Sequence, residues 1–381
     1  MDNGPQNSIT PSRRRSLRCW QPGQESWQLH SLPNGSPGLR DLASNDYLGL
    51  SRHPAVLEAA ATSLQANGLG AAGSRLVTGT RPLHLLLEQQ LAAWLGRERV
   101  LLFPSGFQAN IAAVMALADR HCTVLADRLI HHSLLVGVRA SGAKLQRFLH
   151  NNPEDLERRL KRLKPQSSPP VVITESLFSM EGTSPDLTVI SSICDRHGAR
   201  LLVDEAHALG VLGPDGRGLC ADLSEPVHLI SGTFGKAFGS GGAFLASDAE
   251  MADQLLQNSG AFRYTTALAP ALVAGVLAAL KLIKANPDWS CELMQRGQIW
   301  RDAIARRGWT RPLGQGPVLP LLVGGDQAAL NLQGHLEQQG LLSVAIRPPT
   351  VPEATARLRL VLRRDLPQDT LDLLIQALPE Q

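Results

Sequence analysis

Two short stretches of the chain hold side chains that could do chemistry together. The first, LLVDEAHALG at 201–210, is an apolar run that reaches Asp204. The second, SGTFGKAFGSGG at 231–242, places Lys236 among glycines and small residues. An amine in such surroundings can have a lowered pKa and form a Schiff base. A buried carboxylate can keep a pyridine-like nitrogen protonated, which makes the ring an electron sink.

An amine and an acid of this kind are what pyridoxal phosphate demands of a protein: the lysine for its aldehyde and the acid for its ring nitrogen. Each side chain also has an ordinary structural interpretation. Lys236 alone would usually be a solvated loop lysine, and Asp204 alone could be a turn former at a strand end. The choice depends on the rest of the chain.

The sequence Asp-Glu-Ala-His at 204–207 also matches the magnesium-binding strand end of ATP-driven helicases. Such an ATPase needs a Gly-x-x-x-x-Gly-Lys-Ser/Thr loop before the acidic strand. The only Gly-Lys pair ends at Lys236, with Ile230 in place of the first glycine and Ala237 in place of the hydroxyl. This stretch also follows the acidic strand, so the residues and their order both exclude the helicase interpretation.

Short apolar runs recur between residues 100 and 250, with helix-like stretches such as 106–120 and 153–163 between them. The runs do not alternate in polarity, which is typical of strands buried on both faces of a parallel sheet. Ligands of open α/β sheets bind beyond the carboxyl ends of the strands, so Asp204 and Lys236 are expected at one rim. The runs are VLLF (100–103), TVLA (123–126), VVIT (171–174), RLLVD (200–204), HLIS (228–231) and GAFLAS (242–247).

Composition divides the chain into three segments. Residues 1–45, rich in Pro, Gly, Ser and Asn, are predicted to form an N-terminal arm. Residues 46–285 are predicted to form a large cofactor-binding domain, and 286–381 a smaller C-terminal α/β domain. The apolar stretch 269–283 is too short to cross a bilayer and contains a proline, so it predicts a core helix.

The bulk composition excludes several classes of protein. The 381 residues are 43% hydrophobic and 19% charged with a net charge of +3, so no nucleic-acid or membrane partner is expected. The short basic run at 13–15 is interpreted as a solvated terminal segment. Five widely spaced cysteines without a Cys-x-x-Cys predict reduced thiols, no metal site and a cytoplasmic location. No apolar segment typical of a secretory signal follows the basic run.

From Asp41 to Leu362 the chain closely resembles the α-oxoamine synthases, a family of fold-type I pyridoxal-phosphate enzymes. The resemblance implies an α/β fold: a large domain with a seven-stranded, mostly parallel sheet and a smaller C-terminal α/β domain. Eight motifs in order carry it: SNDYLGL (44–50), GLGAAGSRLVTGT (68–80), LFPSGFQAN (102–110), ADRLIHHS (126–133), ESLFSMEGTSPDL (175–187), VDEAHALGVLGPDGRG (203–218), GTFGKAFGSGG (232–242) and IRPPTVPEATARLRL (346–360).

The resemblance assigns catalytic roles to Lys236, Asp204 and His131, and a cofactor contact to His207. Lys236 matches the lysine that forms the internal aldimine and then removes the α-proton of the amino acid. Asp204 matches the partner of the pyridinium nitrogen, and His207 resembles the residue that binds the phenolic oxygen of the cofactor. His131 matches the histidine that stacks on the ring, with the adjacent His132 as the alternative.

Further residues are expected to hold the cofactor. Gly106 and Phe107 are candidates for the phosphate, because backbone amides at a helix N-terminus bind anions. Thr233 resembles a hydroxyl that also reaches the phosphate, and Ser179 a second donor to the phenolic oxygen. Thr266 resembles the residue that reaches the phosphate of the neighbouring subunit, which implies a homodimer with shared active sites.

The carboxylate of the amino-acid substrate calls for a guanidinium fork, and Arg359 matches the family position. The alternative is that Arg357, Arg359 and Arg363 form the solvent-facing row of an alternating strand. Asn45 would assist at the carboxylate.

Three more residues are expected at the substrates. Thr350 resembles a substrate contact in the small domain, Arg15 is the best match to an arginine near the acyl substrate, and His131 would also contact substrate.

Within the family, the motif at 346–360 favours a decarboxylating condensation of L-alanine with pimeloyl-CoA, or with pimeloyl on acyl carrier protein, in biotin biosynthesis. The alternative is a glycine C-acyltransferase that uses a short acyl-CoA. A non-catalytic protein of this fold would be expected to lose Lys236, Asp204 or His131, and all three are present.

Overall fold

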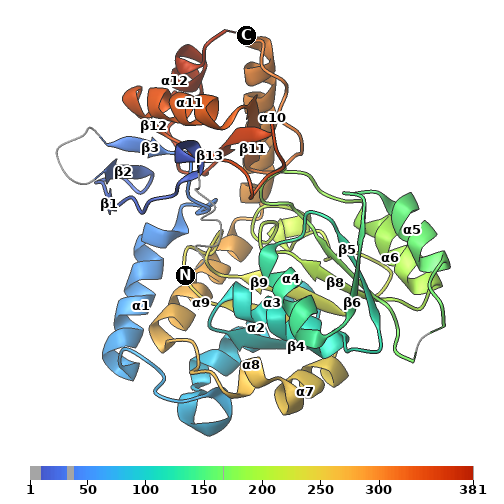
Figure 1. The fold of residues 1–381 in the computed structure, drawn as a ribbon. Coiled ribbons are helices and arrows are strands. Elements are labelled where there is room, and N and C mark those ends of the chain that lie inside the picture. Colours follow the sequence, from blue (N-terminus) through green and yellow to red (C-terminus); the bar gives the residue numbers. More distant parts are fainter. Residues whose placement is uncertain (1–9, 32–37, 166, 381) are drawn as a thin grey trace, which may run out of the picture. The chain divides into compact units, whose positions relative to one another are not determined.

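The computed structural model describes residues 10–31, 38–165 and 167–380, which divide into two compact units (Figure 1). The larger unit comprises 45–179 and 183–294, and the smaller unit comprises 1–44, 180–182 and 295–381. Parts of the predicted arm, residues 1–9 and 32–37, lie outside the described residues. The grouping joins the rest of that arm to the C-terminal segment, and the predicted division at residues 45 and 285 stays a prediction.

A seven-stranded sheet forms the centre of the larger unit, in the order β4-β10-β9-β8-β7-β5-β6. Strand β10 is antiparallel to both of its neighbours, and the pairs among β9, β8, β7, β5 and β6 are parallel. The predicted seven-stranded, mostly parallel sheet is therefore confirmed. Its strands are β4 (Arg99–Phe103), β5 (Thr123–Asp127), β6 (Lys144–Phe148), β7 (Val171–Glu175), β8 (Arg200–Asp204), β9 (Leu229–Thr233) and β10 (Ala243–Ser247).

All six apolar runs form strands of this sheet, but the sequence KLQRF of β6 was not among them. Strand β6 lies at the edge of the sheet, and only Phe148 of its five residues is buried. An edge strand has one neighbour and a partly wet face, so it needs no continuous apolar run.

Helices cover the sheet of the larger unit. Helix α3 packs against β8, β9 and β10 and against α4, and its apolar side lies in the main core. The two predicted helices at 106–120 and 153–163 are confirmed but end earlier, at Leu117 and Lys161. The helices are α1 (Pro54–Asn67), α2 (Pro82–Leu95), α3 (Gly106–Leu117), α4 (His132–Ser141), α5 (Pro153–Lys161), α6 (Leu187–Arg196), α7 (Ala249–Asn258), α8 (Gly260–Arg263) and α9 (Pro270–Ala285).

The smaller unit combines both ends of the chain. Strand β3 (Leu39–Asp41) pairs in parallel with β12 (Leu341–Leu342) and joins the hairpin of β1 (Trp20–Pro22) and β2 (Gln28–Ser31). A second, antiparallel sheet has the order β11-β14-β13, with strands Val318–Gly324, Ala356–Val361 and Val344–Ile346. Helices α11 (Asp326–Gln338) and α12 (Thr370–Ala377) belong to this unit, and α10 (Asp288–Arg306) begins in the larger unit and ends here.

The predicted core helix in the apolar stretch 269–283 is confirmed as α9, and half of its residues are buried. Among the described residues no single helix is long and apolar enough to cross a membrane. One bent pair, α9 with α10, meets the criterion by length and composition only.

Candidate active site

The predicted site residues of the larger unit follow strands that run in one direction. Because β10 is antiparallel to both β4 and β9, these two strands point the same way as β5, β7 and β8. Their carboxyl ends therefore lie along one edge, where ligands of open α/β sheets bind. Gly106 follows β4, His131 follows β5, Ser179 follows β7, Asp204 ends β8, and Lys236 follows β9.

The Asp204 carboxylate is buried, with 5% of the residue exposed, and is held by two donors. The Asn110 side-chain amide donates to Oδ2 at 2.7 Å, and the Ala206 backbone N–H donates to Oδ1 at 2.9 Å. Asn110 comes from α3, about one turn after Gly106 and Phe107, the residues that the sequence assigned to the phosphate. The acid therefore has a fixed orientation before any ligand binds.

The same Asn110 amide connects Asp204 to His131 through Ser133. Asn110 Nδ2 donates to Ser133 Oγ at 2.9 Å, and Ser133 Oγ lies 2.7 Å from His131 Nδ1. Since the serine oxygen accepts from Asn110, its single proton is available for His131 Nδ1, which accepts it. The neutral imidazole then carries its own proton on Nε2. Asn110 Oδ1 is buried without a hydrogen-bond partner among the described residues.

Electrostatic interactions place the three proposed catalytic side chains together. Loss of water around the imidazole lowers the pKa of His131, the negative charge of Asp204 raises it, and the positive charge of Lys236 lowers it. The neighbouring His132 lowers it as well, so Asp204, Lys236 and His132 all act on this ring. His131 is nevertheless exposed, so its ring can meet a ligand. His132 is also exposed, and its ring lies 6.5 Å from that of Phe107. This arrangement favours His131 over His132 as the stacking residue.

His207 is buried and bonded to a residue that the sequence did not single out. The Tyr47 hydroxyl lies 2.6 Å from His207 Nδ1 and 3.4 Å from Asn45 Oδ1. Asn45 and His207, predicted at the substrate and at the cofactor, thus share one neighbour. Tyr47 is fully buried and belongs to the SNDYLGL motif, so the motif was the available signal for it.

Glu205 follows Asp204 directly but performs a different task. Its carboxylate accepts from Ser176 Oγ at 2.6 Å and from the Cys220 backbone N–H at 2.7 Å. Burial raises the pKa of Glu205 above its ordinary value, against the opposing hydrogen bonds from Cys220 and Ser176. Glu205 thus fastens the loop that leads to Cys220, a task separate from that of Asp204.

A candidate phosphate site lies where α3 begins. The Ser105 side chain caps this helix by accepting from the Gln108 backbone N–H at 3.3 Å. A Cβ added to Gly106 would lie 3.6 Å from Thr233 Oγ1, so the two predicted phosphate contacts are neighbours. Helix N-terminal amides are suitable donors for a phosphate. The Thr233 hydroxyl donates to the Gly242 carbonyl at 3.0 Å in this structure, so it would have to exchange that bond to reach a phosphate. Phe107, the next residue, is 45% exposed.

The remaining predicted residues of the larger unit lie in turns and loops. Thr266 forms an isolated antiparallel bridge with Ser74, which joins its loop to the glycine-rich segment 68–80. Lys236 is half-buried, and its carbonyl accepts from the Gly239 backbone N–H at 2.8 Å. Ser179 is half-buried in the turn after β7.

Three predicted substrate residues belong to the smaller unit. Arg15 Nη2 donates to Thr350 Oγ1 at 2.9 Å, so the structure brings these two together. Arg359 lies in β14 with only 6% of the residue exposed. Arg363 is also buried and lies 3.1 Å from Asp41, and Arg357 is half-buried and donates to Glu181 at 3.4 Å. The alternative of a solvent-facing arginine row is therefore wrong.

The comparisons with known proteins agree with this geometry. The family model of aminotransferase class I and II matches residues 38–378, so the chain belongs to that family. This chain is similar in structure to serine palmitoyltransferase (SPT), for which a high-resolution structure contains the pyridoxal-phosphate internal aldimine. It has a TM-score of 0.90 and 25% identity over 95% of this chain and 91% of that one.

Curated relatives identify a more specific class of enzyme within this family. The 8-amino-7-oxononanoate synthase of Klebsiella pneumoniae subsp. pneumoniae is 42% identical over 89% of this chain and 88% of that protein. The solved synthase of the same name from Francisella tularensis has a TM-score of 0.76 and 27% identity over 89% of this chain and 95% of that one. The chain is thus a member of the 8-amino-7-oxononanoate synthase family, a group of pyridoxal-phosphate-dependent acyltransferases, which confirms the resemblance inferred from the eight motifs.

Proposed function

We propose that the chain condenses L-alanine with a pimeloyl thioester to give 8-amino-7-oxononanoate, carbon dioxide and the free thiol, in biotin biosynthesis. The similarity to synthases of that name supports the reaction. The observation that carries the site assignment is the hydrogen-bonded chain from Asp204 through Asn110 and Ser133 to His131, with Lys236 close enough to change the pKa of that histidine.

Pyridoxal phosphate, when bound, supplies an electron sink for the negative charge that develops on the α-carbon of alanine. Asp204, held by Asn110 and Ala206, keeps a proton at the ring nitrogen. The amine of Lys236 takes the proton from the α-carbon as general base. The amides of Gly106 and Phe107 and the Thr233 hydroxyl hold the phosphate and so fix the position of the ring.

His131 and His207 complete the proposed cofactor site. A neutral imidazole suits a position over a protonated ring, because a second positive charge there would be repelled, and the lowered pKa of His131 favours the neutral form. His207, oriented by Tyr47, donates to the phenolic oxygen together with Ser179. Arg359 receives the alanine carboxylate, with Asn45 assisting.

We also propose a homodimer in which Thr266 reaches the cofactor phosphate of the partner subunit. A groove of about 500 Å³ in the larger unit supports the proposal that a partner subunit covers this surface. Its lining residues include Leu83, Leu86 and Leu277. The Ser74–Thr266 bridge adjoins the glycine-rich segment, in which Leu76 is 51% and Val77 is 77% exposed. Exposed apolar side chains gathered in this way are typical of protein interfaces.

The cytoplasm is the proposed location, in keeping with the predicted reduced thiols.

The experiment is a substrate panel with the purified, cofactor-loaded chain. L-Alanine, glycine and L-serine are each combined with pimeloyl-CoA, pimeloyl carrier protein or acetyl-CoA, and the product and carbon dioxide are measured by mass spectrometry. Product that requires both L-alanine and a pimeloyl thioester is expected. Turnover of glycine with acetyl-CoA in place of that product would support the glycine C-acyltransferase alternative. Borohydride should fix the cofactor to Lys236 and leave a Lys236→Ala variant unlabelled.

A further inference from the structure

The turn after β7 carries Ser179, the proposed second donor to the phenolic oxygen of the cofactor. The Phe178 backbone N–H donates to the Thr183 carbonyl at 2.9 Å, and this bond joins the two ends of the turn. Phe178 is fully buried, whereas Ser179 and Thr183 are half-buried. The position of the Ser179 hydroxyl therefore depends on what holds Thr183.

His150, which lies just beyond β6, forms a hydrogen bond with Thr183. Its Nε2 is 2.8 Å from Thr183 Oγ1, and its Nδ1 is 3.0 Å from Oδ1 and 3.1 Å from Oδ2 of Asp127, the last residue of β5. A carboxylate only accepts, so Nδ1 carries the proton, and Nε2 of the neutral ring accepts from the Thr183 hydroxyl. The His150 ring also packs edge-on against Phe178, with 4.4 Å between the ring centres.

The carboxylate of Asp127 connects this bond to a second part of the site. Asp127 is fully buried, and its Oδ1 also accepts from the Leu129 backbone N–H at 2.9 Å. That bond fixes the turn after β5, which leads directly to His131. One carboxylate thus holds the segment that presents His131 and, through His150, the turn that presents Ser179.

A further hydrogen bond joins the ends of the same two strands. The His131 backbone N–H donates to Oε1 of Glu175, the last residue of β7, at 2.5 Å. The positions of His131 and Ser179 relative to each other are therefore set by two links, one direct and one through His150.

We propose that His150 is a positioning residue of the cofactor site, an inference that rests on the proposed function. It touches neither cofactor nor substrate, and it acts through Thr183, whose hydroxyl holds the turn that carries Ser179. A donor to the phenolic oxygen stabilises the form of the bound cofactor that has lost a proton. A displaced Ser179 should therefore raise the pH at which the cofactor loses that proton.

The alternative is that His150 only anchors the loop after an edge strand. Strand β6 pairs with β5, and β7 lies on the other side of β5. A residue that anchored β6 alone would need no bond beyond Asp127. The bond to Thr183 extends past β5 to the turn after β7, which favours a role in placing that turn.

The test uses the cofactor-loaded chain and variants that break the link at its two sides. His150→Asn keeps an amide that can donate to Asp127 but is too short to reach Thr183. Thr183→Val keeps the shape of the side chain and removes the hydroxyl, whereas Thr183→Ser retains the hydroxyl. His150→Asn and Thr183→Val should each lower kcat about tenfold, with KM for L-alanine within about twofold, and Thr183→Ser should stay within about twofold in both.

The absorbance of the bound cofactor, followed against pH without substrate, gives the readout that a structural role would not change. Its midpoint should move to higher pH in His150→Asn and Thr183→Val, as in Ser179→Ala, and stay in place in Thr183→Ser. Because the link acts through Ser179, the shift caused by Thr183→Val should largely vanish in a Ser179→Ala background. Hydrogen exchange at the Phe178 amide should also be faster in Thr183→Val.

His228 provides the matched control. It is half-buried like His150, and its Nδ1 accepts from the Leu201 backbone N–H at 3.1 Å. It precedes β9 and so lies at the amino end of that strand, away from the rim. His228→Asn should lower the unfolding temperature slightly and leave kcat and the cofactor midpoint unchanged.

An unchanged cofactor midpoint in both His150→Asn and Thr183→Val would overturn the proposal and leave His150 as a loop anchor. A Thr183→Val shift that persisted in full in the Ser179→Ala background would also overturn it, since the link would not act through Ser179. These results leave product formation by the unmodified chain intact. Failure of the proposed function shows itself differently, as absence of 8-amino-7-oxononanoate from the unmodified chain with either pimeloyl thioester.

Discussion

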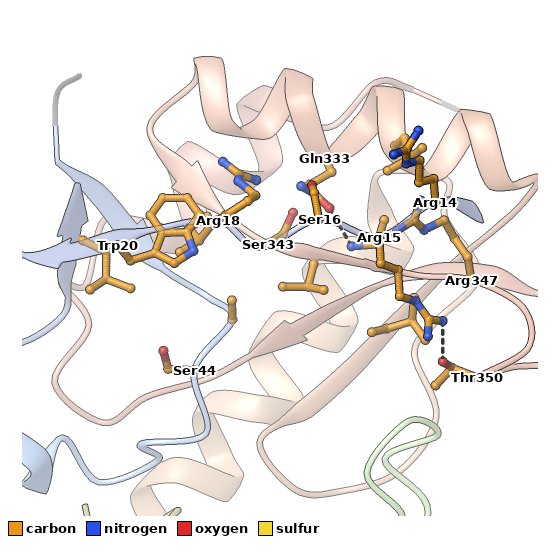
Figure 2. A pocket seen from close by; sticks show the side chains of 17 residues that line it. Arg14, Arg15, Ser16, Arg18, Trp20, Ser44, Gln333, Ser343, Arg347 and Thr350 are labelled. Carbon is orange, nitrogen blue, oxygen red and sulfur yellow. Dashed lines mark hydrogen bonds between the residues drawn. The ribbon is translucent and has the colours of Figure 1, made fainter. Parts of the chain in front are cut away.

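The rim of the large sheet differs from a pocket of the smaller unit, lined by Arg14, Arg15 and Arg347, in how the charged groups are paired (Figure 2). At the rim, the Asp204 carboxylate receives donors from Asn110 and Ala206, and the network continues through Ser133 to His131. In the pocket, Arg14 has no carboxylate partner and Ser343 Oγ has no hydrogen-bond partner among the described residues. The charged groups of the rim are therefore held by the protein itself, although Asn110 Oδ1 there has no partner among the described residues, whereas the guanidinium of Arg14 is not paired with a carboxylate.

This difference leads to different expectations for substitutions. Groups in one hydrogen-bonded network depend on each other, so removing one member should disturb the rest. Separate charges that face a ligand should act more independently and respond to salt. The predictions below test the rim side of this contrast.

The largest effect is expected at Lys236. Lys236→Ala removes the proposed base at the α-carbon, so turnover of L-alanine with pimeloyl-CoA should fall by about a thousandfold or more. Cofactor should still bind, but dialysis should remove it, because no covalent bond holds it. Absorbance before and after dialysis measures this. The exposed Lys144, at the start of the edge strand β6, provides the control, and Lys144→Ala should retain full activity. A Lys236→Ala variant that kept a tenth of the activity would contradict the assignment.

Two adjacent acids give the next largest contrast. Asp204→Asn removes the charge that keeps the ring nitrogen protonated, and kcat should fall about a hundredfold or more. Glu205→Gln replaces a carboxyl group whose pKa burial already raises, and it retains an acceptor for Ser176 or Cys220. Its activity should stay within about threefold, with a stability loss of about 1–2 kcal/mol by urea unfolding.

Equal losses of activity in Asp204→Asn and Glu205→Gln would contradict the separation of the two roles. A Glu205→Ala variant extends the comparison, because it leaves both donors to Glu205 without an acceptor. It should unfold more easily than Glu205→Gln while the remaining folded fraction stays active.

Local patterns were sufficient to predict the strands of the sheet and the ends from which the site is built. The run RLLVD predicted β8, and the rule that ligands bind beyond the carboxyl ends of such strands placed Asp204 and Lys236 at one rim. The same approach did not find β6, because KLQRF is an edge strand with one buried residue and has no apolar run to detect.

The residues that hold the site residues in place could not be predicted in the same way. Asn110 and Asp204 are 94 positions apart, and Tyr47 and His207 are 160 apart, so only the folded chain brings them together. Both Asn110 and Tyr47 lie in motifs that carried the family resemblance, but their types allow many roles. The burial of Arg359 was likewise open, since alternating arginines in ARLRL are also typical of a wet strand face.

Asn110 should show whether the rim network acts as a unit. Asn110→Ala removes the 2.7 Å hydrogen bond to Asp204 and the bond to Ser133 together, so kcat/KM should fall about ten- to fiftyfold. Asn110→Asp keeps the shape but replaces a donor to Asp204 with a second negative charge, which should repel the Asp204 carboxylate and reduce activity further. A purely structural role predicts the reverse order, with the near-isosteric aspartate milder than alanine. The absorption spectrum of bound cofactor should shift in both variants.

The smallest effect is expected at Ser133. Ser133→Ala removes the hydroxyl that donates to His131 Nδ1, so the neutral imidazole is less stabilised and the pKa of His131 should rise. Burial holds that pKa below its ordinary value in the unmodified chain, so the folded chain binds fewer protons there than the unfolded chain. The contribution of this pKa difference to the free energy of unfolding is complete at pH values above the ordinary histidine pKa, and it is lost as the pH falls. The acid limb of kcat/KM should therefore move to higher pH in Ser133→Ala, while Ser141→Ala, in the same helix, should leave it in place. If the acid limb stayed unchanged in both variants, His131 would not depend on Ser133, and the side chains of the rim would act as independent groups.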